Sequence, residues 1–361
     1  MTGTASGEET AAMTPELNEG DFGRTAETPS GKGAGDENFP VGSWLLPARL
    51  RPHVAKFYAF ARAIDDIADN PKLTPEDKIR RLDRFEDAIT GRKTEDPALV
   101  TAHRLRASLA ETGVTAQHCV DLVAAFKQDA VKLRYDDWDD LLGYCALSAN
   151  PVGRYLLDLH GEDPAGYPTS DALCSALQVI NHLQDCGNDY RNLDRVYLPQ
   201  DWMAASGITV EALAASASPA GLRRVLDLCL DATAALLEQA DRLPGRLRSR
   251  YLALESAVIV ALAHRLVGEL GARDPLAERV VLNKVHLRAC RALSLPITSP
   301  PPRSGSHGRF GNYNPSGKIR TQDAGPSTVR RPHRPCHAAV IARVAVLVEH
   351  RQIDPPEALR F

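Results

Sequence analysis

The chain has 361 residues, of which 43% are hydrophobic and 25% are charged, so it is long enough for one large domain or two small ones. Its formal net charge of -3 gives no electrostatic argument for a nucleic-acid partner. The seven cysteines include no C-x-x-C pair, which argues against a disulfide framework or a zinc site and fits a reducing cytoplasm.

The first 36 residues are rich in Gly, Thr, Glu and Ser and contain almost no large apolar side chains, which is typical of a disordered leader. They include no basic stretch followed by an apolar stretch, so no secretory signal is expected. We expect a folded domain over residues 37–297. Apolar residues recur there at helical spacing and no alternating strand pattern repeats, which predicts a single all-α domain.

Within this domain, several segments carry clear helical periodicity. Thr74 is expected to cap a helix in which Pro75 takes the first position, and Ser170 and Asp171 are expected to precede the helix that follows them. The periodic segments are residues 83–90, 116–133, 172–188, 220–241 and 252–270.

Two acidic clusters, Asp65-Asp66-Ile67-Ala68-Asp69 and Asp185-Cys186-Gly187-Asn188-Asp189, lie about 120 residues apart. Each has an Asp at positions i and i+4, so in a helix the two carboxylates would share one face, one turn apart. Like charges at that spacing destabilise an isolated helix by a few tenths of a kcal/mol. Mg²⁺ offsets such repulsion and is usually held by one or two carboxylates plus substrate phosphates. The clusters therefore predict a magnesium-dependent diphosphate site.

The alternative is that these acidic residues belong to solvated helix faces, as a single Asp-x-x-x-Asp pattern usually does. The sequence before each cluster, in residues 57–64 and 177–184, is mostly apolar, which is typical of buried helices. Buried carboxylates need a counter-charge or a metal. Arg62 lies three residues before Asp65, on the same helical face, where it would bind phosphate oxygens or pair with a neighbouring Asp.

Four motifs, in order and with plausible spacing, resemble the signatures of the squalene/phytoene synthase family. They are the opening segment from Asn38-Phe39-Pro40 to Pro47, and residues 58–69, 144–153 and 178–199. The resemblance spans about residues 38–200, and the helical remainder to 297 fits the same domain. It implies the all-α isoprenoid synthase fold, in which helices surround a deep apolar cavity and the Asp-rich motifs face each other at its mouth.

The same resemblance implies roles for individual residues. Mg²⁺ ions would grip the diphosphate, arginines would stabilise its departure, and aromatic faces would stabilise a carbocation, although core packing accounts for the aromatic residues equally well. The implied catalytic residues and metal ligands are Asp65, Asp69, Asp185 and Asp189, with Asp66 as a further metal ligand. The implied substrate-binding residues are Phe39, Tyr58, Arg62, Tyr144, Val152, Gly153, Gln178, Asn181, Gln184, Arg191, Arg195 and Tyr197.

Within the family, the chain most resembles the bacterial hydroxysqualene synthases, which convert presqualene diphosphate to hydroxysqualene in hopanoid biosynthesis. Gln184 and Asn188 stand where other members commonly carry an Arg and an acidic residue, and Ser148-Ala149-Asn150-Pro151 replaces a small-residue step. These amide and hydroxyl groups would position a water molecule that captures the carbocation.

Other functions stay open. They include a synthase of presqualene diphosphate, squalene or phytoene, and a non-catalytic scaffold homologue, although a scaffold has no physical need for facing carboxylates. No Gly-rich dinucleotide fingerprint follows a predicted strand, which mildly disfavours an NADPH-dependent squalene synthase.

From residue 298 to 361 the chain is rich in Pro, Ser, Gly and Arg and lacks helical periodicity, which predicts a disordered tail. The alternative is a basic tail attracted to anionic lipid or nucleic acid. The apolar run at residues 338–348 is too short to span a bilayer. We expect a cytoplasmic protein and leave open a peripheral contact at the inner face of the membrane. The sequence does not define the oligomeric state.

Overall fold

The computed structural model describes residues 46–93 and 96–282. Within these ranges the regular structure is helical, and the paired backbone outside the helices is an isolated bridge between Tyr135 and Pro199. This confirms the predicted all-α class. The expected leader, the opening motif with Phe39 and the tail from residue 298 lie outside the described residues.

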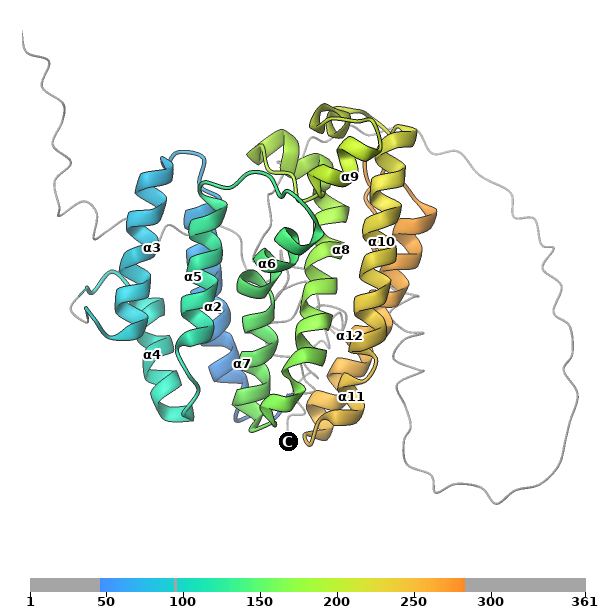
Figure 1. Ribbon diagram of the computed structural model, residues 1–361. Coiled ribbons are helices and arrows are strands. Elements are labelled where there is room, and N and C mark those ends of the chain that lie inside the picture. Colours follow the sequence, from blue (N-terminus) through green and yellow to red (C-terminus); the bar gives the residue numbers. More distant parts are fainter. Residues whose placement is uncertain (1–45, 94–95, 283–361) are drawn as a thin grey trace, which may run out of the picture.

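The helices run roughly along one common direction (Figure 1). In that view α2 to α5 form one side, α8, α10 and α12 form the other, and α6 and α7 lie between them. In chain order the α-helices are α2 (Arg51–Ala68), α3 (Pro75–Thr90), α4 (Val100–Thr112), α5 (Gln117–Asp129), α6 (Trp138–Ser148), α7 (Asn150–His160), α8 (Tyr167–Leu193), α9 (Gln200–Ala205), α10 (Ala220–Ala240), α11 (Leu243–Arg246) and α12 (Arg250–Ala272). The short 3-10 helices η2 (Pro164–Gly166) and η3 (Val210–Ala214) lie in the connections before α8 and before α10.

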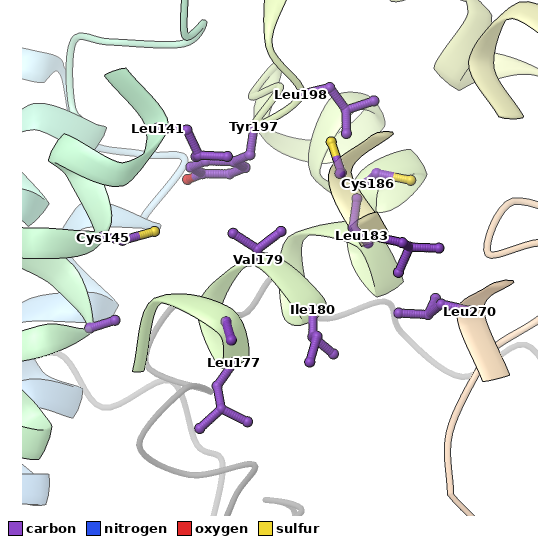
Figure 2. Close-up of a cluster of buried hydrophobic side chains, with 14 of the residues drawn as sticks. Leu141, Cys145, Leu177, Val179, Ile180, Leu183, Cys186, Tyr197, Leu198 and Leu270 are labelled. Atoms are coloured by element: carbon purple, nitrogen blue, oxygen red, sulfur yellow. The ribbon is translucent and has the colours of Figure 1, made fainter. Parts of the chain in front are cut away.

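Two hydrophobic clusters hold these groups of helices together. One joins α2 to α5 with α7, and in it the ring of Phe57 stacks on that of Tyr155 with centroids 3.9 Å apart. The other surrounds α8 (Figure 2), where Val179 points toward Tyr197 and Leu183 toward Leu270 of α12. Because α8 packs against neighbours on several sides, most of its residues are buried, polar ones included.

The helix ends follow from local chemistry, with one correction. Thr74 caps α3 as predicted, since its side chain accepts a hydrogen bond from the backbone N–H of Asp77 at 3.2 Å. The prediction that Ser170 and Asp171 precede a helix was wrong, because that helix, α8, begins earlier, at Tyr167, with a Pro in its first turn. Asp171 is therefore inside α8, where its carboxylate binds Arg154 of α7 through hydrogen bonds of 2.9 and 2.6 Å.

Among the described helices, α12 is long and apolar enough to cross a membrane by length and composition alone. Its most apolar window is 33% buried against the rest of the protein. A core helix of a globular protein passes the same test, so this one helix is weak grounds for a membrane span.

Candidate active site

Both acidic clusters lie near the C-terminal ends of long helices. Asp65 and Asp66 are in the last turn of α2, and Asp69 is its C-cap residue. Asp185 and Asp189 are in the last turns of α8. The predicted helical spacing of both pairs is thus present. A helix C-terminus carries a partial negative charge, so acidic side chains there are unfavourable unless cations offset them.

Arg62 supplies the cation for the first cluster. Its guanidinium lies 2.9 Å from a carboxylate oxygen of Asp66 and 3.5 Å from one of Asp65. Asp65 is only 1% exposed, so this positive charge is close to a carboxylate that is removed from water. Arg62 therefore has the position that both sequence interpretations required, beside the carboxylates and on their helical face.

Arg195 joins the second cluster to the first. It follows the C-terminus of α8, and its backbone N–H donates to the carbonyl of Asp189 at 3.3 Å. Its guanidinium donates to Asp69 Oδ1 at 2.7 Å and to the Ala68 carbonyl at 3.1 Å, and the side chain is 3% exposed. One buried ion pair thus connects the first cluster to the segment that directly follows the second, far away in sequence. The other carboxylate oxygen, Asp69 Oδ2, is buried and has no hydrogen-bond partner among the described residues.

A further acidic residue, Asp129 at the end of α5, lies close enough to Arg195 and Asp69 to interact with their charges. It is 2% exposed and accepts hydrogen bonds from the hydroxyls of Tyr144 at 2.7 Å and Tyr197 at 3.2 Å. Burial raises the pKa of Asp129 to about 6, although the positive charge of Arg195 opposes the shift. Sequence reasoning missed Asp129 because it stands alone. The signal available was a single carboxylate at the end of the largely apolar helix α5.

The charges around Arg195 act on one another. Burial by itself lowers the pKa of the Arg195 guanidinium, but Tyr197 and the nearby carboxylates raise it well above its ordinary value. Burial lowers the pKa of Lys78 on α3, and the charge of Arg195 lowers it further, while Asp69 and Asp129 oppose this shift. Lys78 is therefore a further cation near this ion pair that the sequence motifs did not indicate.

Tyr144 and Tyr197, two of the predicted substrate-binding residues, pack around Asp129. Burial raises the pKa of both the Tyr144 and the Tyr197 hydroxyl well above the ordinary value, so both stay protonated at neutral pH. The ring of Tyr197 also stacks on that of His182, with centroids 3.7 Å apart. The hydroxyls of these tyrosines thus hold Asp129, and their rings form part of the cluster around α8.

Other predicted residues bind protein groups. The amide nitrogen of Gln184 donates to the carbonyl of Val280 at 2.6 Å. Asn188 Oδ1 accepts from Arg191 at 2.9 Å, and this arginine is exposed. The amides that the sequence proposed for positioning water are therefore engaged near the C-terminal end of α8.

The remaining predicted residues lie deeper. Val152 belongs to the cluster that joins α2 to α5 with α7, and Asn181 is buried on α8. A Cβ atom at Gly153 would stand 2.4 Å from the Ser170 hydroxyl oxygen, so this glycine lets α7 and α8 approach closely. Tyr58 Oη, Ser148 Oγ and Gln178 Oε1 are also buried without a hydrogen-bond partner among the described residues.

The carboxylates present fit magnesium bound together with a diphosphate. Within the described ranges, no three His, Cys, Asp or Glu side chains converge closely enough to hold an ion on their own. Mg²⁺ commonly takes only one or two carboxylates and completes its shell with phosphate oxygens and water. Asp69 Oδ2, a buried carboxylate oxygen without a partner in the described chain, is a hard ligand of the required kind.

Sequence comparisons identify the family. A family model described as squalene/phytoene synthase matches residues 33–288. A hydroxysqualene synthase of Rhodopseudomonas palustris is 46% identical over 72% of this chain and 88% of its own length. A hydroxysqualene synthase of Zymomonas mobilis subsp. mobilis is 42% identical over 71% of this chain and 86% of its own. A phytoene synthase of Rhodobacter capsulatus is 31% identical over 66% and 69%.

Structural comparisons give the same fold. A squalene synthase from Alicyclobacillus acidocaldarius superposes with a TM-score of 0.57 and 31% identity, over 62% of this chain and 84% of that one. A dehydrosqualene synthase in complex with a ligand superposes with a TM-score of 0.56 over 69% and 87%, and its 21% identity makes this a likeness of fold alone. The predicted isoprenoid synthase fold is confirmed. With its family-model match, its relatives and its fold in agreement, the chain belongs to the squalene/phytoene synthase family.

Proposed function

We propose that the chain is a hydroxysqualene synthase, which cleaves the carbon–oxygen bond of presqualene diphosphate and captures the rearranged carbocation with water. The products are hydroxysqualene and diphosphate. Relatives of that name, 46% and 42% identical to this chain, support the assignment. The single observation that carries the chemistry is the buried ion pair of 2.7 Å between Arg195 and Asp69, because it connects the first acidic cluster to the segment that directly follows the second.

The acidic clusters would hold the metal and the arginines would hold the diphosphate. Bound Mg²⁺ would supply Lewis acidity to the leaving group. Its proposed ligands are Asp65, Asp66, Asp69, Asp185 and Asp189. Arg62 and Arg195 already contact carboxylates of the first cluster, and a guanidinium has further donors in a plane that matches phosphate oxygens.

The groups around the leaving group would favour ionisation without destroying the carbocation. Arg195 is fixed by its two hydrogen bonds and by burial, so it needs little reorganisation as charge develops. The Tyr144 and Tyr197 hydroxyls are held protonated by burial, and neither acts as a base. Neither hydroxyl would therefore remove a proton from a carbocation formed nearby.

A squalene synthase is the second candidate, because the Alicyclobacillus acidocaldarius structure bears that name at 31% identity. The two functions differ in the species that quenches the carbocation, which is water in one and a hydride from NADPH in the other. Incubation of the purified protein with presqualene diphosphate and Mg²⁺, with and without NADPH, separates them. We expect hydroxysqualene in both incubations, whereas squalene formed only with NADPH would favour the second candidate.

The cellular location forms part of the same proposal. A cytoplasmic enzyme whose substrate is a long apolar diphosphate would collect it from the inner face of the membrane, so we propose a peripheral contact there. Partly exposed apolar residues on α12 support such a contact. Flotation of the purified protein with vesicles is the test, and failure to float with either neutral or anionic vesicles would contradict it.

A further inference from the structure

Helix α8 packs against α7 in a regular antiparallel register. Arg154 of α7 binds Asp171 of α8 through hydrogen bonds of 2.9 and 2.6 Å. Four residues earlier in the chain, the Asn150 side-chain oxygen accepts a hydrogen bond of 3.0 Å from Ser175, which stands four residues after Asp171. Moving four residues toward the N-terminus of α7 is therefore matched by moving four residues toward the C-terminus of α8.

The same register continues into α6. The ring of Tyr144 lies 6.0 Å from that of His182, centroid to centroid. Ser148 stands one turn after Tyr144, and Gln178 stands one turn before His182. Since the contacts on both sides of this position are observed, the register places Ser148 of α6 opposite Gln178 of α8.

These two facing side chains share an unusual property. Ser148 Oγ and Gln178 Oε1 are both buried and both lack a hydrogen-bond partner among the described residues, and Gln178 is only 1% exposed. A nearby residue of the same kind, Ser175, is satisfied by Asn150. Buried polar atoms that protein groups leave unsatisfied commonly bind an ordered water molecule.

The chemistry of the pair suits a water that acts as a nucleophile. Both oxygens accept hydrogen bonds, so a water between them would donate its two hydrogens to the protein and keep its lone pairs free. Gln178 is seven residues before Asp185 on α8, which places it two turns, about 10 Å, from the metal-binding end. The pair is thus separated from the diphosphate, whereas the amide of Gln184 is engaged with Val280.

We propose that Ser148 and Gln178 hold the water molecule that captures the carbocation, an inference that rests on the proposed function. The water oxygen forms the new carbon–oxygen bond, one of its O–H bonds breaks, and the proton passes through further water molecules to the diphosphate released by ionisation. Ser148 and Gln178 stay neutral throughout. Neither therefore removes a proton from the carbocation, which would give a hydrocarbon in place of the alcohol.

The test separates ionisation from capture. Ser148→Ala and Gln178→Met each remove one acceptor, Ser148→Thr keeps the hydroxyl, and Ser175→Ala is the matched control on α8. With presqualene diphosphate and Mg²⁺, the rate of diphosphate release and the ratio of alcohol to hydrocarbon are measured. We expect release to stay within about threefold of the parent protein, and the ratio to fall about tenfold in the first two variants, the size of one lost hydrogen bond. The control and Ser148→Thr should keep the parent ratio.

The outcomes distinguish the two proposals. If the parent protein forms no alcohol, the proposed function itself is wrong. If it forms alcohol and Ser148→Ala keeps the parent ratio, the water site is wrong and the function stands. A loss of diphosphate release with an unchanged ratio would also overturn the water site, because the residues would then act in ionisation. Circular dichroism and melting temperature verify folding, and Ser148→Ala decides alone if Gln178→Met does not fold.

Discussion

Replacement of Asp129 by Asn should change how the stability of the protein depends on pH. Burial raises the pKa of this carboxyl from 3.8 to about 6 in the folded protein. An acid whose pKa is raised by folding binds its proton more tightly in the folded state, so its contribution to stability is lost as pH rises through the folded pKa. At about 1.4 kcal/mol per pKa unit the whole loss is about 3 kcal/mol, of which about 2 kcal/mol falls between pH 4 and pH 7.

An asparagine side chain at this position would carry no charge at any of these pH values, so the Asp129→Asn variant should lack this decline. Urea unfolding of both proteins at several pH values between 4 and 7 gives the difference in their free energies of unfolding, and other titrating groups cancel in that difference. We expect the parent protein to lose about 2 kcal/mol relative to the variant across this range. Asp231→Asn on the exposed face of α10 is the control for losing one carboxylate. A difference that is constant, or that grows in favour of the parent as pH rises, would refute the reasoning.

Three further predictions concern the metal ligands, the buried ion pair and the C-terminal tail. Asp65→Asn and Asp185→Asn should each lower magnesium-dependent turnover at least about a hundredfold, the size of one key electrostatic contact, and near-normal turnover in a folded variant would remove the metal assignment. Arg195→Leu should lower the free energy of unfolding by about 3–5 kcal/mol, because it leaves the largely covered carboxylate of Asp69 without its cation, and a loss below about 1 kcal/mol in urea titrations would contradict this. Truncation after residue 299 should leave melting temperature and turnover in detergent nearly unchanged, and a fall of more than a few degrees would show that the tail stabilises the domain.

Local chemistry made much of the fold predictable. Helical periodicity located α10 and α12 to within two residues of their observed ends, and Thr74 indicated the start of α3. The start of α8 was misplaced because Ser170 and Asp171 look like capping residues, whereas Pro168 in the first turn marks the true beginning. Capping signals compete within a few residues, and tertiary packing decides between them.

The site was predictable where its geometry is local. The relation of Arg62 to the first acidic cluster follows from helical spacing alone. The contact of Arg195 with Asp69 and the burial of Asp129 depend on how distant helices pack, which the order of residues does not state. The same limit applies to Gln178, whose unsatisfied oxygen is visible only once α6 and α8 are placed side by side.

The origin of the product oxygen tests the central claim most directly. The purified protein is incubated with presqualene diphosphate and Mg²⁺ in ¹⁸O-labelled water, and the product is analysed by mass spectrometry. Water capture predicts hydroxysqualene that carries one ¹⁸O atom and forms equally well without NADPH. An unlabelled alcohol, or a hydrocarbon that requires NADPH, would contradict the account.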